Sequence, residues 1–239
     1  MAFLFISMKV AILIDGGFFL KRAEAAIPNF ETDPERTANL IVSYAMRHVE
    51  HYNDESSRDD TLYRIFYYDC PPLTKKAHYP VSKRAIDFSK TEQSKFREHL
   101  FKSLRSKRKL ALRLGYLSDN GSWKIHPRAM KDLLKGSREW KDLKDSDFQY
   151  DIRQKAVDSR IAVDIASLAF KSQVDRIVLI AGDADFVPAS KLARREGIDF
   201  ILDPLHNHIS EDLHEHIDGC HSKGLKPNKG QNKSQQTNR

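Results

Sequence analysis

The sequence is poor in cysteine and has no long apolar run. Its 239 residues include two cysteines, Cys70 and Cys220, which lie far apart and lack the spacing of a disulfide framework. Two free thiols fit a reducing cytoplasm better than a secreted scaffold. No apolar stretch reaches the roughly 18 residues of a membrane-spanning helix, and residues 1–7 are too few for a signal peptide. We therefore expect a soluble, cytoplasmic protein with no membrane partner.

Glycine patterns that bind nucleotide phosphates are also missing. Gly16 and Gly17 lack the spacing of a dinucleotide fingerprint or a P-loop, and the chain has no internal repeat. A phosphohydrolase acting on small phosphorylated molecules is one alternative class, because aspartates at strand ends serve that chemistry too. Against it, no Asp-x-Asp directly follows the first predicted strand.

Positive charge is concentrated in two segments. Residues 75–113 contain 13 lysines and arginines against three acids, and residues 221–239 contain five against none. Because the formal net charge of the chain is only +7, the remainder is acidic. A nuclease needs this combination, with carboxylates for metal and cations for the phosphate backbone. The alternative is that these cations only solvate helix faces, which we prefer for the tail alone.

Apolar runs and helical spacing alternate along the chain. They predict buried strands over residues 9–14, 62–68, 176–181 and 198–202, and helices over residues 34–51, 152–171 and 186–196. Strands that alternate with helices indicate an α/β fold, with a mostly parallel sheet covered by helices on both faces.

The stretch from about residue 79 to residue 150 has the pattern of an insertion in this core. Residues 89–92 form a capping box ahead of a helical repeat. Alternating apolar residues over 109–117, followed by Asn120 and Gly121, predict a hairpin. We expect one domain over residues 8–219 that carries this basic helix-plus-hairpin insertion, and a disordered basic tail over residues 220–239.

Four of the predicted strands end in an aspartate, namely Asp15, Asp69, Asp183 and Asp203. Ligands gather at the carboxyl ends of strands in open α/β sheets. Carboxylates that converge there need a cation, and hard oxygen ligands select Mg²⁺ or Mn²⁺. The alternative is that each aspartate caps the following helix. Capping explains less well why Asp183 and Asp185 share one turn directly after a buried strand.

Asp158 falls on the apolar face of the helix predicted over residues 152–171. At about 100° per residue, that face is formed by Val157, Ile161, Ala162, Ile165, Leu168 and Ala169. A charge there needs a partner. Lys155, one turn earlier, could pair with Asp158 or with a substrate phosphate. A core aspartate paired to lysine is the alternative to a metal ligand, and we favour the metal ligand for Asp158 over Asp164, which lies at the edge of the face.

Four blocks follow one another along the chain: Ile14-Asp15-Gly16-Gly17, Gln154-Lys155-Ala156-Val157-Asp158, Asp164-Ile165-Ala166 and Ala181-Gly182-Asp183-Ala184-Asp185-Phe186-Val187-Pro188. Together they resemble the signature of the NYN domain family, in particular its bacterial LabA-like branch. The resemblance runs from about Lys9 to Gly219. Its specific part is the Gly-Asp-x-Asp-Phe block with the upstream Val-Asp helix, whereas the Asp-Gly-Gly block alone is weak.

The NYN family is similar to PIN and flap-type nucleases. The resemblance therefore implies a Rossmann-like, PIN-like sheet and an acidic site that binds one or two divalent metal ions. Carried over by position, Asp15, Asp158 and Asp183 would be the core metal ligands. Asp185 and Asp164 would be auxiliary.

These observations predict a metal-dependent ribonuclease that hydrolyses phosphodiester bonds of single-stranded or structured RNA with Mg²⁺ or Mn²⁺. The expected catalytic residues are Asp15, Asp158, Asp183 and Asp185, and the expected metal ligands are Asp15, Asp158, Asp183 and Asp164. The expected substrate-binding residues are Lys155, Lys107, Arg108, Lys109 and Arg113. The rival function is a non-catalytic nucleic-acid-binding or assembly module with the same fold. The sequence leaves the oligomeric state open, a homodimer included.

Overall fold

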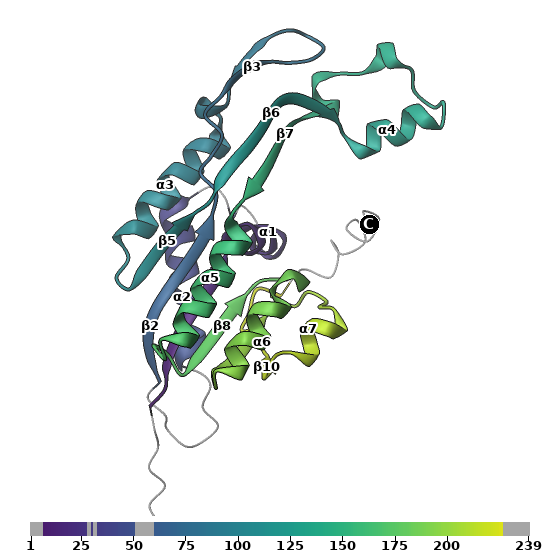
Figure 1. Ribbon diagram of the computed structural model, residues 1–239. Coiled ribbons are helices and arrows are strands. Elements are labelled where there is room, and N and C mark those ends of the chain that lie inside the picture. The colour runs from purple at the N-terminus through teal and green to yellow at the C-terminus, as the bar shows by residue number, and fades with distance from the viewer. Residues whose placement is uncertain (1–6, 28–29, 31–32, 51–59, 227–239) are drawn as a thin grey trace, which may run out of the picture.

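The computed structural model describes residues 7–27, 30, 33–50 and 60–226. A six-stranded parallel sheet forms its centre, in the order β10-β9-β8-β1-β2-β5 (Figure 1). The strands are β1 (Lys9–Asp15), β2 (Thr61–Asp69), β5 (Leu110–Leu114), β8 (Arg176–Ile180), β9 (Asp199–Asp203) and β10 (Gly219–Cys220). The four strands predicted from apolar runs are all present, and the expected α/β class is confirmed.

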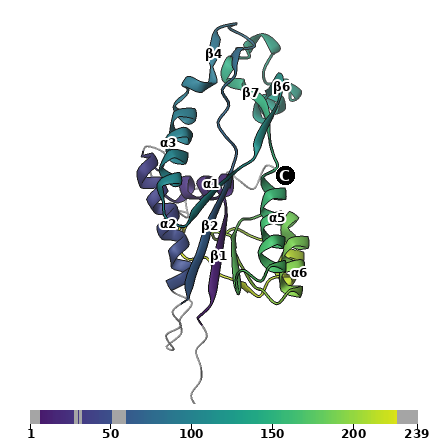
Figure 2. The ribbon, with the colours of Figure 1, turned by 60° about the vertical axis from the view of Figure 1, so that its left-hand side comes forward.

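Helices cover both faces of this sheet. One layer contains α1 (Gly16–Ala26), α2 (Pro34–Glu50) and α3 (Glu92–Ser106), and the other contains α5 (Val157–Phe170), α6 (Val187–Arg195) and α7 (Glu211–Glu215) (Figure 2). Successive side chains of a strand point to opposite faces, so β1 places Ile12 and Ile14 in the first layer and Leu13 in the second. A strand buried on both faces is apolar throughout, which is why β1 could be predicted from its sequence.

A lobe extends beyond the carboxyl ends of β2 and β5 (Figures 1 and 2). We use this name for residues 75–90 and 116–155, which form β3 (Lys76–His78), β4 (Ala85–Asp87), the 3₁₀ helix η2 (Phe88–Lys90), β6 (Tyr116–Ile125), α4 (Pro127–Leu134) and β7 (Phe148–Lys155). Its two antiparallel strand pairs are joined by aromatic contacts. Between ring centroids, Trp123 on β6 lies 5.3 Å from Tyr79, which follows β3, and Tyr150 on β7 lies 4.9 Å from Phe88, which follows β4.

The insertion expected over residues 79–150 is not a single unit. β5 lies in the middle of that range and forms an edge strand of the central sheet, and α3 packs against α2 in the core. The expected hairpin turn at Asn120 and Gly121 is also wrong. β6 continues through both residues with a bulge after Asp119, where the φ angle of Gly121 is 69°. The connection from β6 to β7 is made by residues 126–147 instead.

The helix predicted over residues 152–171 begins later, at Val157, because residues 148–155 form β7. Phe148, Tyr150 and Ile152 alternate with polar residues in β7, and this period of two is typical of a strand. Ala156 then adopts a φ angle of 66°, which separates the strand from the helix.

Two helix starts also differ from expectation. α1 begins immediately after Asp15, so Gly16 and Gly17 form its first turn and not a separate tight turn. The predicted helix after the capping box is present as α3, but its cap is Thr91, whose hydroxyl accepts a hydrogen bond from the Ser94 N–H at 3.3 Å. Ser89 belongs to η2 instead.

The start of the expected tail belongs to the folded domain. Cys220 pairs with β9, and the Ser222 hydroxyl donates to the Asp203 carboxylate at 2.9 Å. The disorder predicted from residue 220 is therefore wrong for residues 220–226. The remainder of the expected tail, residues 227–239, lies outside the described residues. Among the described helices, none combines the length and hydropathy needed to cross a bilayer.

Candidate active site

Asp15 ends β1 and caps α1. Its Oδ1 accepts a hydrogen bond from the Phe18 N–H at 3.1 Å, which satisfies one of the free amides in the first turn. The next residue has to be glycine, because a Cβ on Gly16 would lie 2.5 Å from the ring of Tyr67. This close approach of α1 to β2 fixes Asp15 at the carboxyl edge of the sheet.

Asp183 follows the neighbouring strand, β8, and caps the 3₁₀ helix η5 (Ala184–Phe186). Its Oδ1 accepts a hydrogen bond from the Asp185 N–H at 3.1 Å. A Cβ on Gly182 would lie 2.5 Å from the ring of Phe18. The loop after β8 therefore packs directly on the first turn of α1, which brings the ends of these two adjacent strands together.

Asp158 lies in the first turn of α5 and connects the two strand ends electrostatically. Desolvation, and then the charges of Asp183 and Asp185, raise the pKa of Asp158. Burial raises the pKa of Asp15 to about 6. The Phe18 N–H opposes this shift, and the charges of Asp158 and Asp69 add to it. The charges of Asp183 and Asp185 thus act on Asp158, and the charge of Asp158 acts on Asp15, so these four carboxylates lie at one end of the sheet.

The surroundings of Asp158 differ from the sequence expectation. Val157, Ile161 and Ile165 are buried as predicted, whereas Asp158 itself is exposed. Because α5 starts at Val157, Asp158 lies in the first turn and not inside the apolar stripe. Lys155 is not one helical turn away either, since it is the last residue of β7.

Asp69 and Arg97 form an ion pair beside this group, and the sequence did not reveal it. An Arg97 NH group donates to the Asp69 carboxylate, which is almost fully buried at the end of β2. Burial raises the pKa of Asp69, and the Arg97 guanidinium opposes that shift. The buried Tyr67 hydroxyl lies close enough for Asp69 to raise its pKa, yet among the described residues it makes no hydrogen bond of regular geometry. The position of Asp69 at a strand end was the available signal. Nothing in the sequence indicated its partner on α3.

Asp164 has its own partners. The Tyr68 hydroxyl donates to its carboxylate at 2.8 Å, and Arg113 Nε donates to it at 3.2 Å. Both partners come from neighbouring strands, β2 and β5, and these contacts attach α5 to the sheet. Asp164 is therefore engaged in holding α5 against the sheet.

Two of the expected substrate-binding cations lie toward the carboxyl edge of the sheet. Lys155 is exposed and directly precedes the turn that leads into Asp158. Arg113 is level with Tyr68 in the parallel register of β2 and β5, close to the ends of both strands.

The other three expected cations, Lys107, Arg108 and Lys109, lie at the opposite end of β5. Lys107 Nζ contacts Glu35 Oε1 at 2.6 Å, and Lys109 Nζ donates to the backbone carbonyl of Leu62. β5 has five residues, and at roughly 3.3 Å per residue its length separates this group from the carboxyl edge by about 16 Å. These contacts anchor the turn between α3 and β5.

The chemistry of the acidic residues suits a hard divalent cation. Their carboxylate oxygens are the ligands that Mg²⁺ and Mn²⁺ prefer. The repulsion between these carboxylates is relieved by positive charge. In the part of the chain that the structure describes, no three His, Cys, Asp or Glu side chains already lie close enough together to hold an ion. Mg²⁺ commonly uses one or two carboxylates and completes its coordination with water and substrate phosphates, so the donor set fits this ion.

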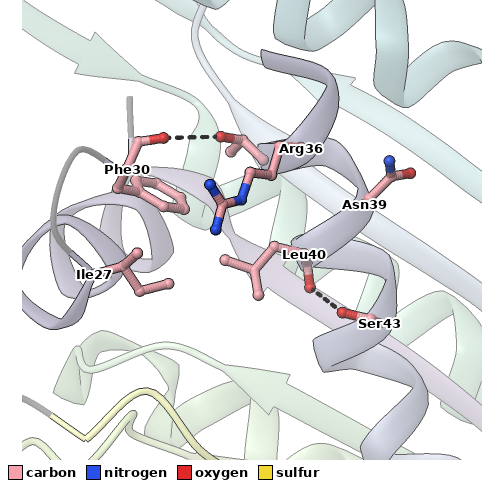
Figure 3. Close-up of a pocket in the computed structure, with 7 residues that line it drawn as sticks. Ile27, Phe30, Arg36, Asn39, Leu40 and Ser43 are labelled. Atoms are coloured by element: carbon pink, nitrogen blue, oxygen red, sulfur yellow. Dashed lines mark hydrogen bonds between the residues drawn. The ribbon is translucent and has the colours of Figure 1, made fainter. Parts of the chain in front are cut away.

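A separate cavity of about 330 Å³ lies between the end of α1 and the first turns of α2 (Figure 3). The residues that line it include Ile27, Phe30, Arg36, Asn39 and Leu40. It contains none of the acidic residues described above and is not part of their site.

Comparison with known proteins gives a family. The NYN domain model matches residues 78–222, more than half of the chain, and this range contains Asp158, Asp183 and Asp185. A crystal structure of a protein of unknown function from Vibrio parahaemolyticus RIMD 2210633 is similar, with a TM-score of 0.43 and 15% identity over 94% of this chain and 97% of that one. No curated protein matches the chain. NYN domains have a PIN-like, nuclease-like fold, and such nucleases usually use divalent metals. The chain belongs to the NYN domain family.

Proposed function

We propose that this protein is a divalent-cation-dependent ribonuclease of the LabA-like branch, with Asp15, Asp158, Asp183 and Asp185 as its site. The observation that carries the proposal is the gathering of these carboxylates at one end of the sheet, where burial, and then the charges of Asp158 and Asp69, raise the pKa of Asp15 to about 6. Ionised carboxylates that raise one another's pKa are costly to bring together without a cation. Perturbed carboxylates of this kind concentrate at functional sites.

We assign Asp15, Asp158 and Asp183 to hold Mg²⁺ or Mn²⁺, one or two of them directly and the rest through coordinated water. When bound, the cation supplies positive charge to the attacked phosphate and lowers the pKa of a coordinated water. We assign Asp185, exposed on the turn after Asp183, to accept a hydrogen bond from the attacking water and so to orient it. Lys155 and Arg113 are the cations that we expect to contact the RNA backbone near this site.

Cys70 and Cys220 are both free thiols, which suits a reducing compartment, and we propose that the enzyme acts in the cytoplasm. The rival function is a nucleic-acid-binding or assembly module that keeps the fold without turnover. The rival predicts RNA binding that is insensitive to Mg²⁺ and Mn²⁺, and no product.

A cleavage assay separates these two functions. End-labelled single-stranded RNA, and DNA of the same sequence, are incubated with the full chain in Mg²⁺, in Mn²⁺ and in EDTA. The Asp183→Asn variant is run in parallel. We expect metal-dependent cleavage of RNA that disappears in EDTA and in Asp183→Asn, whose side chain can still cap η5. RNA that binds but is never cleaved supports the rival, and cleavage by Asp183→Asn at the wild-type rate contradicts the proposed site.

A further inference from the structure

A cavity of about 280 Å³ lies beside the acidic residues on the same edge of the sheet. In the sheet, β8 and β1 lie side by side, and β2 and then β5 come next. Asp183 follows β8 and Asp15 ends β1, whereas the cavity opens over the carboxyl ends of β2 and β5. Three segments enclose it: residues 70–73 after β2, the first turns of α3, and the paired strands β6 and β7. The cavity thus continues the carboxyl edge from the acidic residues toward the lobe.

Two side chains of the cavity also reach the acidic residues. Arg97 lines the cavity and is paired with Asp69, whose charge is felt by Asp15. Gln154 also lines it, and a Cβ placed on Gly17 would lie 3.8 Å from Gln154 Oε1 and 3.5 Å from Asp15 Oδ1. A ligand in the cavity would therefore lie next to the proposed cleavage site.

The walls of the cavity combine aromatic, aliphatic and amide groups. The rings of Phe88 and Tyr150 lie 4.9 Å apart, and Tyr150 is held in place by contacts with Trp123 and with the Lys75 ammonium group. Ile152 stands at the rim with 42% of its surface exposed. The side-chain amides that line the cavity both donate and accept hydrogen bonds. A nucleobase offers the matching features, since it has two aromatic faces and a polar edge.

The volume of the cavity limits what can enter. Pockets for drug-sized ligands measure about 300–1,000 Å³, so a space of about 280 Å³ suits a group of the size of one base. A base has to be unstacked and unpaired to enter a recess of this kind. Arg97 adds a guanidinium at the side nearest the acidic residues, where the phosphate of that nucleotide would lie.

We infer that this cavity holds one unstacked base of a single-stranded RNA whose scissile phosphate lies at the acidic residues. The inference rests on the ribonuclease activity proposed above. It deepens that proposal by restricting the substrate to RNA with an unpaired nucleotide next to the cleaved bond.

Binding measurements on the full chain test the cavity without requiring turnover. The probe is a short, fluorescein-labelled, single-stranded oligoribonucleotide, and its anisotropy is followed in Mg²⁺ in the Asp183→Asn background. Two variants alter the cavity. Ile152→Asp removes an apolar rim and adds a negative charge, and Gln93→Glu adds the same charge in the first turn of α3, where an acid favours the helix.

Each variant has a matched control outside the cavity. Phe170→Asp makes the same kind of change at a residue that is 63% exposed, at the far end of α5. Gln149→Glu makes the same charge change as Gln93→Glu on β7, where Tyr150, Ile152 and Gln154 line the cavity and Gln149, by alternation, points to the other side. The melting temperatures of all four variants establish that each is folded.

We expect both cavity variants to raise the Kd at least about fivefold, the lower end of what one stacked base contributes, and both controls to leave it unchanged. Removing one base at a time from the probe should identify a single position where its loss weakens binding in the parent but not in Ile152→Asp. A duplex of the same sequence should compete poorly. Equal binding by cavity variants and controls, or equal competition by the duplex, overturns the inference.

The cleavage assay on the wild type distinguishes failure of the cavity from failure of the proposed function. If the wild type cleaves RNA while the cavity variants bind it normally, the ribonuclease assignment stands and the cavity inference is wrong. If the cavity variants bind poorly while the wild type never cleaves, the cavity binds RNA and the ribonuclease assignment is wrong. An absence of both binding and cleavage by the wild type rejects both.

Discussion

Asp15, at the end of β1, lies close enough to Asp158, in the first turn of α5, for the charge of Asp158 to raise the pKa of Asp15. Burial makes the largest contribution, and together with Asp158 and Asp69 it brings that pKa to about 6. The pair forms because α5 begins at the same edge at which β1 ends. At neutral pH the metal-free protein therefore contains an ionised carboxylate that its surroundings disfavour.

The first prediction is that Asp15→Asn stabilises the metal-free protein at neutral pH. The raised pKa of Asp15 lets this group stabilise the fold below pH 4, and that contribution is lost as the pH rises through about 6. Asparagine removes the charge and still accepts the Phe18 hydrogen bond as a helix cap. The gain in the free energy of unfolding is at most about 3 kcal/mol, the equivalent of a two-unit shift.

Thermal melts in EDTA at pH 7.5 and pH 4 check this prediction. Asp15→Asn should melt higher than the wild type at pH 7.5 and nearly equally at pH 4. Glu98→Gln, an exposed carboxylate on α3, is the control and should change little at either pH. A variant that is no more stable than the wild type at pH 7.5 shows that Asp15 is not electrostatically strained.

The strand ends show how much of the site the sequence could predict. Asp15 and Asp183 follow apolar runs that are long enough to be buried strands, and parallel strands bring their carboxyl ends to one edge. The distance between Asp15 and Asp183 depends on how Phe18 packs against Gly182. This contact joins distant parts of the chain, so no local sequence pattern predicts it. Asp69 was visible as a strand end, but its pairing with Arg97 depends on how α3 packs against the sheet.

Residues 148–157 show where periodicity failed. Val157 and Ile161 belong to a real helical stripe, and extending that stripe backward to Ile152 misassigned a strand. β7 forms because it pairs with β6, which lies about thirty residues earlier in the chain. Position in the sheet also separates the cations from one another. Arg108 and Lys155 have the same charge, and the topology places them at opposite ends of the strands.

A second prediction concerns Asp203, a strand-end aspartate that anchors the C-terminal segment. The Tyr44 hydroxyl donates to its carboxylate at 2.6 Å and accepts a hydrogen bond from the Lys223 N–H at 3.2 Å. Tyr44→Phe should lower the free energy of unfolding by about 1–3 kcal/mol, because a buried carboxylate loses a donor. Tyr63→Phe, which removes a hydroxyl from a partly exposed position on β2, is the control and should cost less.

The pH dependence of that loss provides a further check. Burial raises the pKa of Asp203, but the hydrogen bonds from His48, Tyr44 and the Leu205 N–H outweigh burial and hold it below the usual carboxyl range. A lowered pKa stabilises the fold above the usual carboxyl pKa, and this stabilisation is lost as the pH falls through the lowered value. The effect of Tyr44→Phe, measured by denaturant unfolding, should therefore be full at pH 7 and shrink in acid. An effect that grows in acid contradicts this role.

A third prediction separates the cations by their place in the fold. Lys155→Gln should weaken RNA binding and lower the slope of log Kd against log salt by about 0.7, the value for one phosphate contact on a single strand. Arg108→Gln, at the amino end of β5, removes the same charge and should leave the slope unchanged. The measurement is anisotropy over a series of salt concentrations. If Arg108→Gln has the larger effect, RNA crosses the α3–β5 turn and our placement of the substrate is wrong.

The rate of RNA cleavage by Asp158→Asn across a Mn²⁺ titration tests the central claim most directly. Asp158 is the member of the acidic group that lies on an α-helix, and Asp164→Asn on the same helix is the matched control, since Asp164 is engaged by Tyr68 and Arg113. Our account predicts that Asp158→Asn stays folded and loses at least about a hundredfold in rate at every Mn²⁺ concentration, the scale observed when a group that stabilises transition-state charge is removed. It predicts only a several-fold loss for Asp164→Asn. Wild-type cleavage by Asp158→Asn throughout the titration would contradict the account.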